Sequence, residues 1–365
     1  MSLGVITIVL PNLSGGGAER LHVNLANDWV LMGYKVRFIL LLKQGELISL
    51  LATEIEIIDL KVYRIRDAIL PLASHFRRMR SNVTLVAMWP LTSAAVFAWV
   101  LSGCTGKLYL SEHENLSESY IGQGRARAFY LYGLIKISYP IATGVIAVSR
   151  GVKLDLCSLG SLSDNFVRVI YNPAAIGTMP ALATASTRGD LWGDGVDYRI
   201  LAVGRLSPQK DHQTLIRAVA LLPKHIAFRL VILGEGPLRR DLEELVNRLG
   251  LNGRVALPGF VVDPRPWFLS ASLFVLSSKW EGFGNVIVEA LECGLPVVST
   301  DCPSGPSEIL EDGRFGKLVP VHDPAALSKA ITESLQEPHD HAALMLRALD
   351  FSVRKISEEY LSYMF

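Results

Sequence analysis

Short apolar runs alternate with helix-length segments along the chain of 365 residues, and this alternation limits the fold more than any other feature. Most runs are unbroken stretches of Val, Ile and Leu, which is typical of parallel strands covered by helices on both faces. In the first half they lie at residues 4–10, 35–42, 54–60, 82–88, 107–113, 144–149 and 168–172. This pattern predicts a doubly wound α/β domain.

The alternation stops once and then starts again. Residues 173–198 are rich in Pro, Gly, Ala, Ser and Thr, which indicates a linker. Further apolar runs follow at 199–205, 228–236, 254–260, 273–278, 296–301 and 316–320. We therefore expect two Rossmann-like domains, at 1–175 and 199–350, joined by a linker at 176–198 and facing a central cleft. Ligands of open α/β sheets bind outside the carboxyl ends of the strands, so the loops after the strands are the places to search.

Composition excludes several classes of protein. Half of the residues are hydrophobic and 19% are charged, as expected for a folded α/β protein and not for a disordered chain. The four cysteines are scattered, so neither a disulfide framework nor a zinc cluster is indicated. The N-terminus lacks a secretory signal, and the apolar stretch 88–103 is too short and too polar to span a membrane. We expect a cytoplasmic protein.

Positive charge gathers in the first half. Residues 1–175 hold 17 Lys and Arg against 12 Asp and Glu. Within the segment 63–81, apolar residues recur at helical spacing beside Arg77, Arg78 and Arg80. This indicates either a basic amphipathic helix on an anionic membrane surface, at the inner face of the cytoplasmic membrane, or an ordinary helix with a solvated charged face interrupted by Pro71. The segment 125–140, which mixes cations with aromatic residues, gives weaker support to the first interpretation.

A glycine run follows the first predicted strand. Gly16 and Gly17 open a helix whose N–H groups suit a phosphate or a sugar, although a tight turn explains the glycines equally well. A nicotinamide dinucleotide site is a third possibility, but the run does not support it, because Arg20 stands where the fingerprint needs its third glycine.

Two cations follow the first strand of the second half. Gly204, Arg205 and Lys210 precede a helix that begins near Asp211. Converging cations at a strand end can hold a diphosphate and stabilise the charge of a departing phosphate, whereas the alternative is a solvated loop.

Residues 280–313 carry the highest density of unusual residues. Glu281 lies in a loop before a helix that starts near Asn285, and Glu289 lies inside that helix among apolar neighbours. The two carboxylates can accept hydrogen bonds from a sugar and a ribose; the alternative is a cap-region acid and a solvated helix residue. Ser304 or Ser307 is expected to cap the next helix. No aspartate pair suitable for Mg²⁺ follows, so we expect no metal.

One histidine ends a predicted strand. His113, in the run SEHEN, can donate to a ligand hydroxyl or transfer protons near neutral pH, or it can be a plain surface histidine.

These residues together resemble a known family. The stretches SGGGAER, SEH, GRLSPQKD and EGFGNVIVEALECGLPVVSTDCPSGPSEIL are similar to those of retaining glycosyltransferases of family 4 with the GT-B fold, and the resemblance covers nearly the whole chain. DCPSGP resembles in particular the bacterial members that build surface polysaccharides or lipid-linked oligosaccharides.

The resemblance implies a metal-independent transfer with retention at the anomeric carbon, with the donor held by the second domain and the acceptor by the first. Arg205 and Lys210 would neutralise the donor diphosphate, and Glu289 would bind the ribose. Glu281 would contact the sugar, assisted by backbone groups of the turn made of Gly282, Phe283, Gly284, Asn285 and Val286. Gly16 and Gly17 would approach the donor phosphate or the acceptor, and His113 the transferred sugar. The segment 351–365 would cross back to the first domain as a helix.

The expected partners are a nucleotide sugar, with UDP favoured only by analogy, and a glycan or a polyprenyl-diphosphate-linked acceptor; no nucleic acid is expected. Which hexose or N-acetylhexosamine is moved stays open. A nucleotide-sugar epimerase of similar shape and a non-catalytic donor-binding subunit are the alternatives.

Overall fold

The computed structural model describes residues 3–120, 124–176, 192–193 and 195–365. Its backbone contacts divide the chain into unit 1, Met1–Pro173 with Ser352–Phe365, and unit 2, Ala174–Phe351. The last segment of the chain therefore belongs to unit 1, as helix α15 (Val353–Met364). The expected linker at 176–198 lies largely outside the described residues.

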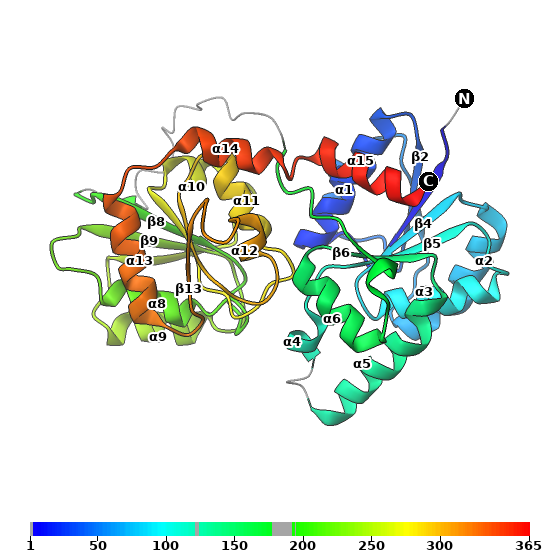
Figure 1. Cartoon of the computed structure of the whole chain (residues 1–365), viewed down its shortest axis with the longest axis horizontal. Helices are drawn as coiled ribbons and strands as arrows, with labels where there is room; N and C mark the ends of the chain where they lie inside the picture. The colour runs from blue at the N-terminus through cyan, green and yellow to red at the C-terminus, as the bar shows by residue number, and fades with distance from the viewer. Residues whose placement is uncertain (1–2, 121–123, 177–191, 194) are drawn as a thin grey trace. The chain divides into compact units, whose positions relative to one another are not determined.

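Unit 1 contains a seven-stranded parallel sheet with the order β3-β2-β1-β4-β5-β6-β7 (Figure 1). The strands are β1 Val5–Leu10, β2 Lys35–Leu40, β3 Glu56–Asp59, β4 Val83–Ala87, β5 Lys107–Glu112, β6 Gly144–Ala147 and β7 Val167–Val169. The order reverses between β1 and β4, which is the switch point at which such sheets bind ligands.

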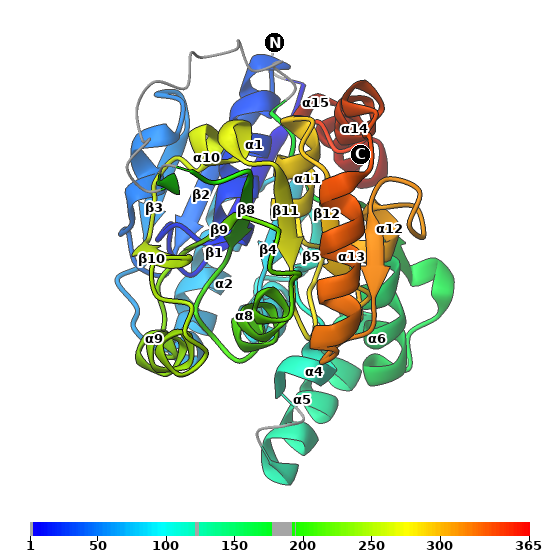
Figure 2. The same cartoon turned by 90° about the vertical axis from the view of Figure 1, so that its left-hand side faces the viewer.

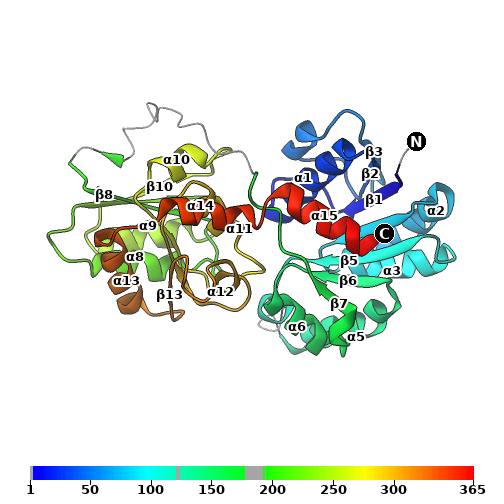
Figure 3. The same ribbon diagram turned by 45° about the horizontal axis from the view of Figure 1, so that its top comes forward.

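Helices cover both faces of this sheet. The α-helices are α1 Gly17–Leu31, α2 Ile69–Met79, α3 Leu91–Leu101, α4 Leu116–Tyr120, α5 Arg125–Ser138 and α6 Arg150–Gly160, with α15 at the end of the chain. Short 3₁₀ turns lie at η1 Glu46–Leu50, η2 Ile65–Ala68, η4 Tyr139–Ile141 and η5 Asp164–Phe166. Helices α1 and α15 lie side by side on one face, and α3, α5 and α6 cover the other (Figures 1 and 3). The core on the α1 side includes Trp29 and Tyr360, whose rings lie 6.1 Å apart.

Unit 2 repeats this plan with six parallel strands in the order β10-β9-β8-β11-β12-β13 (Figure 2). The strands are β8 Tyr198–Val203, β9 Phe228–Leu233, β10 Val255–Gly259, β11 Leu273–Leu276, β12 Val297–Thr300 and β13 Lys317–Val319. The helices are α8 His212–Ala220, α9 Arg239–Arg248, α10 Arg265–Ser270, α11 Asn285–Glu292, α12 Pro306–Ile309, α13 Pro324–Gln336 and α14 His341–Leu349. The switch point here lies between β8 and β11.

Every predicted apolar run overlaps a strand, and two details differ from expectation. Pro71 does not interrupt the basic helix, because α2 begins at Ile69 and proline is tolerated in a first helical turn. The N-cap of α12 is Gly305 and neither of the serines. The backbone at this position has a φ of 102°, which glycine adopts without strain. None of the described helices is both long and apolar enough to cross a bilayer.

Candidate functional site

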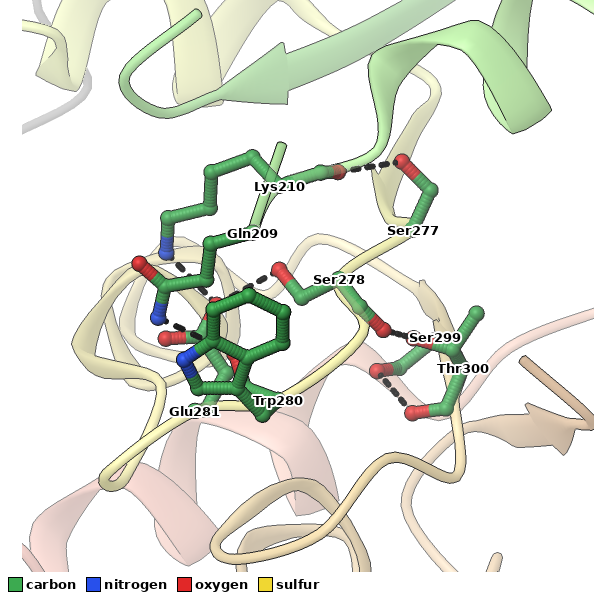
Figure 4. A network of polar contacts seen from close by, with 8 residues as sticks. All are labelled: Gln209, Lys210, Ser277, Ser278, Trp280, Glu281, Ser299 and Thr300. Carbon is green, nitrogen blue, oxygen red and sulfur yellow. Dashed lines mark hydrogen bonds and ion pairs between the residues drawn. The ribbon is translucent and has the colours of Figure 1, made fainter. Parts of the chain in front are cut away.

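An ion pair joins the two loops at the switch point of unit 2. Lys210 follows β8 and Glu281 follows β11, and Nζ of Lys210 lies 2.5 Å from Oε1 of Glu281 (Figure 4). Their side chains are only 16% and 7% exposed. The structure thus brings together two of the predicted site residues that are 71 positions apart in the sequence.

The surrounding loops hold this pair by their own hydrogen bonds. The Ser278 hydroxyl donates to Oε1 of Glu281 at 2.6 Å, so this oxygen accepts two bonds while the other oxygen carries no contact in Figure 4. The Gln209 amide donates to the carbonyl of Trp280 at 3.0 Å, and Ser277 donates to the carbonyl of Lys210 at 2.9 Å. Sequence analysis missed these supporting residues: Gln209 and Ser277 act between two loops that are far apart in the sequence, and Ser278 acts within the loop of Glu281.

A third loop fixes Glu281 through its backbone. The N–H of Glu281 donates to the carbonyl of Pro303 at 3.1 Å. A Cβ added to Gly305 would lie 1.8 Å from the carbonyl oxygen of Phe283, so the two loops touch where only glycine fits. Glu281 is therefore placed by backbone contacts and not only by its ion pair.

Helix α11 carries the second predicted carboxylate. Gly284 enters the helix with a φ of 102°, and the residues Ile287, Val288, Ala290 and Leu291 are buried. Glu289 is half-buried and lies one turn after Asn285 on the less buried side of the helix. Gly282, Phe283 and Gly284 are buried in the turn before it, whereas Val286 is half-buried.

Arg205 differs from Lys210 in its surroundings. Its side chain is exposed and forms no ion pair with any residue that the structure describes. Gly204 lies directly under Lys210, because a Cβ there would meet the Lys210 side chain at 3.2 Å. A larger residue at 204 would therefore displace the lysine.

The glycine run of unit 1 lies beside a carboxylate. Helix α1 begins at Gly17, with Gly16 as its cap, but a Cβ on Gly16 would lie 2.1 Å from Oε2 of Glu19. Burial raises the pKa of Glu19, and the carboxylates of Glu114 and Glu46 add to the increase. Three neighbouring carboxyl groups disfavour the binding of a phosphate at this helix start. Contact of Gly16 and Gly17 with a donor phosphate or an acceptor stays a prediction, and the local electrostatics argue against the phosphate.

His113 lies against a second histidine. Its ring lies edge-on to the ring of His22, 5.1 Å away, and Nε2 lies 3.0 Å from the hydroxyl of Ser111. Burial lowers the pKa of His113 well below its usual value and lowers that of His22 to about 4. The hydrogen-bonding interpretation of His113 therefore agrees with the structure better than proton transfer near neutral pH does.

Glu112, which sequence analysis passed over, is buried beside His113. Its carboxylate accepts hydrogen bonds from Tyr139, from Thr92 at 2.8 Å and from the backbone N–H of Trp89 at 3.3 Å. Burial nevertheless raises the pKa of Glu112 to about 7.

The predicted membrane residues lie on the surface. Arg77, Arg78 and Arg80 are exposed, and Arg77 donates to the carbonyl of Leu101 at 2.6 Å. Leu72, Ala73 and Phe76 of α2 are buried, whereas Leu70 at its start is 73% exposed, so this helix offers charge and one apolar side chain. Among the described residues, no three His, Cys, Asp or Glu side chains gather as metal ligands would.

The pattern of unit 2 has counterparts in known proteins. Residues 197–337 match the family described as glycosyl transferases group 1. Over 237 residues, the chain is 33% identical to the N-acetylgalactosamine-N,N'-diacetylbacillosaminyl-diphospho-undecaprenol 4-alpha-N-acetylgalactosaminyltransferase of Campylobacter jejuni, covering 63% of this chain and 62% of that enzyme. The chain thus spans less than two thirds of that relative.

Longer matches cover both units. A second Campylobacter jejuni protein, GalNAc-alpha-(1->4)-GalNAc-alpha-(1->3)-diNAcBac-PP-undecaprenol alpha-1,4-N-acetyl-D-galactosaminyltransferase, is 25% identical and covers 98% of this chain and 97% of its own. The crystal structure of Anabaena Alr3699/HepE in complex with UDP and glucose is 21% identical, covers 99% of each chain and has a TM-score of 0.82. The expected GT-B fold, with its two Rossmann-like sheets, is confirmed.

Proposed function

We propose that this chain, whose residues 197–337 match the glycosyl transferases group 1 family, transfers a hexose or N-acetylhexosamine from a nucleotide sugar to a glycan or lipid-linked acceptor. The observation that carries the proposal is the Lys210–Glu281 pair at the switch point of unit 2, with the exposed Arg205 in the same loop as Lys210. A cation and a carboxylate held side by side suit a ligand that has a diphosphate next to a polyol.

Transfer requires stabilisation of a departing nucleoside diphosphate. Arg205 can pair with its oxygens bidentately, and Lys210 supplies a point charge whose position is fixed by Glu281. Oε1 of Glu281 accepts from Lys210 and Ser278, and we assign its other oxygen, Oε2, to accept from the sugar hydroxyls. Glu289 is assigned to accept from the ribose hydroxyls. With cations on the phosphate, no metal is required, and we propose retention at the anomeric carbon without a strong base.

The donor is proposed to be UDP-linked, because the Anabaena structure of the same fold holds UDP. A polyprenyl-diphosphate-linked acceptor is proposed because both Campylobacter relatives are named for substrates linked to undecaprenol. The proposed setting is the synthesis of polysaccharides or lipid-linked oligosaccharides on the cytoplasmic side of the membrane.

Labelled nucleotide sugars test the reaction against its alternatives. Release of free nucleotide that depends on an undecaprenyl-diphosphate-linked N-acetylhexosamine supports transfer. Isomerised donor without any acceptor would show an epimerase instead. Donor binding with neither product would show a non-catalytic donor-binding subunit.

A membrane-facing surface of unit 1 is part of the proposal. Helix α5 contains no Asp or Glu, and its outer face exposes Phe129 (81%) and Ile137 (61%) beside Lys136. Both α2 and α5 pack on α3, so the arginines of α2 and the apolar residues of α5 belong to one helical layer. Cations supply attraction to anionic lipid and apolar side chains supply insertion.

Vesicles with and without phosphatidylglycerol test this surface. The triple change of Arg77, Arg78 and Arg80 to Gln should abolish the salt-sensitive part of binding, and Phe129→Ser with Ile137→Ser should weaken binding at all salt concentrations. Leu346→Ser, which alters a residue of α14 that is 66% exposed, is the matched control and should bind like wild type. Equal binding by all variants would remove this surface from the proposal.

A further inference from the structure

A hydrogen-bonded line of side chains connects the C-terminal helix to His113. Tyr360 of α15 places its hydroxyl 3.4 Å from the hydroxyl of Ser111, the penultimate residue of β5. The same Ser111 oxygen lies 3.0 Å from Nε2 of His113. Tyr360 and Ser111 are both fully buried, so water does not compete for these contacts.

The direction in which the hydroxyl protons are donated along this line follows from the hydrogen-bond partners that each buried group has. A buried phenol must donate its proton, because a buried donor without an acceptor is costly. Within the part of the chain that the structure describes, the Tyr360 hydroxyl has Ser111 as its only side-chain partner. Tyr360 therefore donates to Ser111, and the Ser111 proton is then directed to Nε2 of His113, which must accept.

The opposite direction leaves more groups unsatisfied. If Nε2 of His113 carried a proton and donated to Ser111, the Ser111 hydroxyl would turn to Tyr360, and the Tyr360 proton would have no acceptor among the described residues. In the first direction the Nδ1 proton of His113 has no acceptor among the described residues and is left for a ligand, whereas in the opposite direction both the Tyr360 proton and Nδ1 of His113 lack a partner there.

We infer that Tyr360, acting through Ser111, is a positioning residue that places the imidazole proton of His113 on Nδ1. The imidazole is thereby a neutral hydrogen-bond donor of fixed orientation and not a base. His22 is compatible with the same state: its Nδ1–H donates to the carbonyl of Ala18 at 2.7 Å, and burial lowers its pKa to about 4, so the ring that faces His113 is neutral at pH 7.

Helix α15 therefore both packs on unit 1 and orients His113. Other contacts hold α15 on unit 1, such as the hydroxyl of Tyr109 donating to the carbonyl of Tyr363 at 3.2 Å. Among the contacts described for α15, that of Tyr360 leads on to His113. Its effect on turnover rests on the proposed function, whereas the position of the proton does not.

The position of the proton is measured directly by ¹⁵N NMR of the full chain labelled at histidine, with the His113 signals assigned by their loss in His113→Gln. We expect wild type to show a protonated Nδ1 and an unprotonated Nε2. Ser111→Ala and Tyr360→Phe should each move His113 toward a mixture of tautomers. Tyr109→Phe, which also removes a hydroxyl that anchors α15, should keep the wild-type signals.

A proton on Nε2 in wild type would overturn the inference, as would unchanged signals in both Ser111→Ala and Tyr360→Phe. A change in Ser111→Ala alone would remove Tyr360 from the line. In the transfer assay, Tyr360→Phe should lower kcat by about tenfold, the scale of one hydrogen bond, with KM for the donor unchanged. Absence of transfer in every protein, wild type included, would count against the proposed function and leave the NMR result to decide the position of the proton.

Discussion

At the scale of single residues, the Lys210–Glu281 pair is proposed to bind the donor, and it also affects the stability of the fold. Each side chain is largely buried and is balanced by the other, so the removal of one leaves a buried charge alone. We predict that Lys210→Met lowers the free energy of unfolding by about 3 kcal/mol. Lys210→Met combined with Glu281→Gln should recover most of this loss, and urea unfolding of the three proteins measures it. A single variant as stable as wild type would show that the pair is well solvated.

Glu112 makes a second prediction at this scale. Its pKa is about 7 in the folded chain against an ordinary 4.5, so between these pH values the folded state binds more protons than the unfolded state. The stabilising contribution of Glu112 is therefore complete below pH 4.5 and is lost as the pH rises through 7. The loss amounts to roughly 3 kcal/mol.

The matched protein for this measurement is Glu112→Gln. Burial lowers the pKa values of His22 and His212 to about 4, so these two groups make the free energy of unfolding rise with pH in both proteins. The difference in the free energy of unfolding between variant and wild type therefore isolates the effect of Glu112. From pH 4.5 to 7, the variant should gain roughly 3 kcal/mol relative to wild type. Parallel stability curves would show that folding does not raise the pKa of Glu112.

At the scale of elements, the contact between the loops at 281–284 and 302–305 depends on one glycine. Gly305 has a φ of 102° and touches the carbonyl of Phe283, whereas Gly250 has a φ of 66° and would have nothing within 4 Å of an added Cβ. Gly250→Ala should cost about 1 kcal/mol from backbone strain alone. Gly305→Ala should cost clearly more and also weaken donor binding, because it displaces the loop of Glu281. Equal costs in thermal unfolding would contradict this account.

The strands were predictable because buried parallel strands leave unbroken apolar runs that need no knowledge of their neighbours. The types of the site residues were predictable too, since glycines, cations and carboxylates followed the strands. Their pairing was not. Lys210 meets Glu281 only because β8 and β11 are adjacent at the switch point. Glu112 sits among polar neighbours in the sequence and is buried only because Thr92 and Tyr139 reach it from other elements.

At the scale of the whole molecule, the two units repeat one strand order, and each places its candidate residues after strands near its own switch point. Unit 2 carries the region that matches the glycosyltransferase family, and unit 1 carries His113 and the helical layer proposed to face the membrane. The division of labour, donor in unit 2 and acceptor in unit 1, follows from the proposed function and depends first on nucleotide binding by unit 2.

Calorimetric titration of UDP into wild type, Arg205→Met and Arg217→Met tests that claim most directly. Both arginines are exposed and form no ion pair with the described residues, so neither change should disturb folding. We predict that UDP binds wild type and Arg217→Met equally, and that Arg205→Met binds at least about tenfold more weakly, because a charge-assisted hydrogen bond is lost. Equal affinity in all three proteins, or no binding of UDP to any of them, would contradict the account.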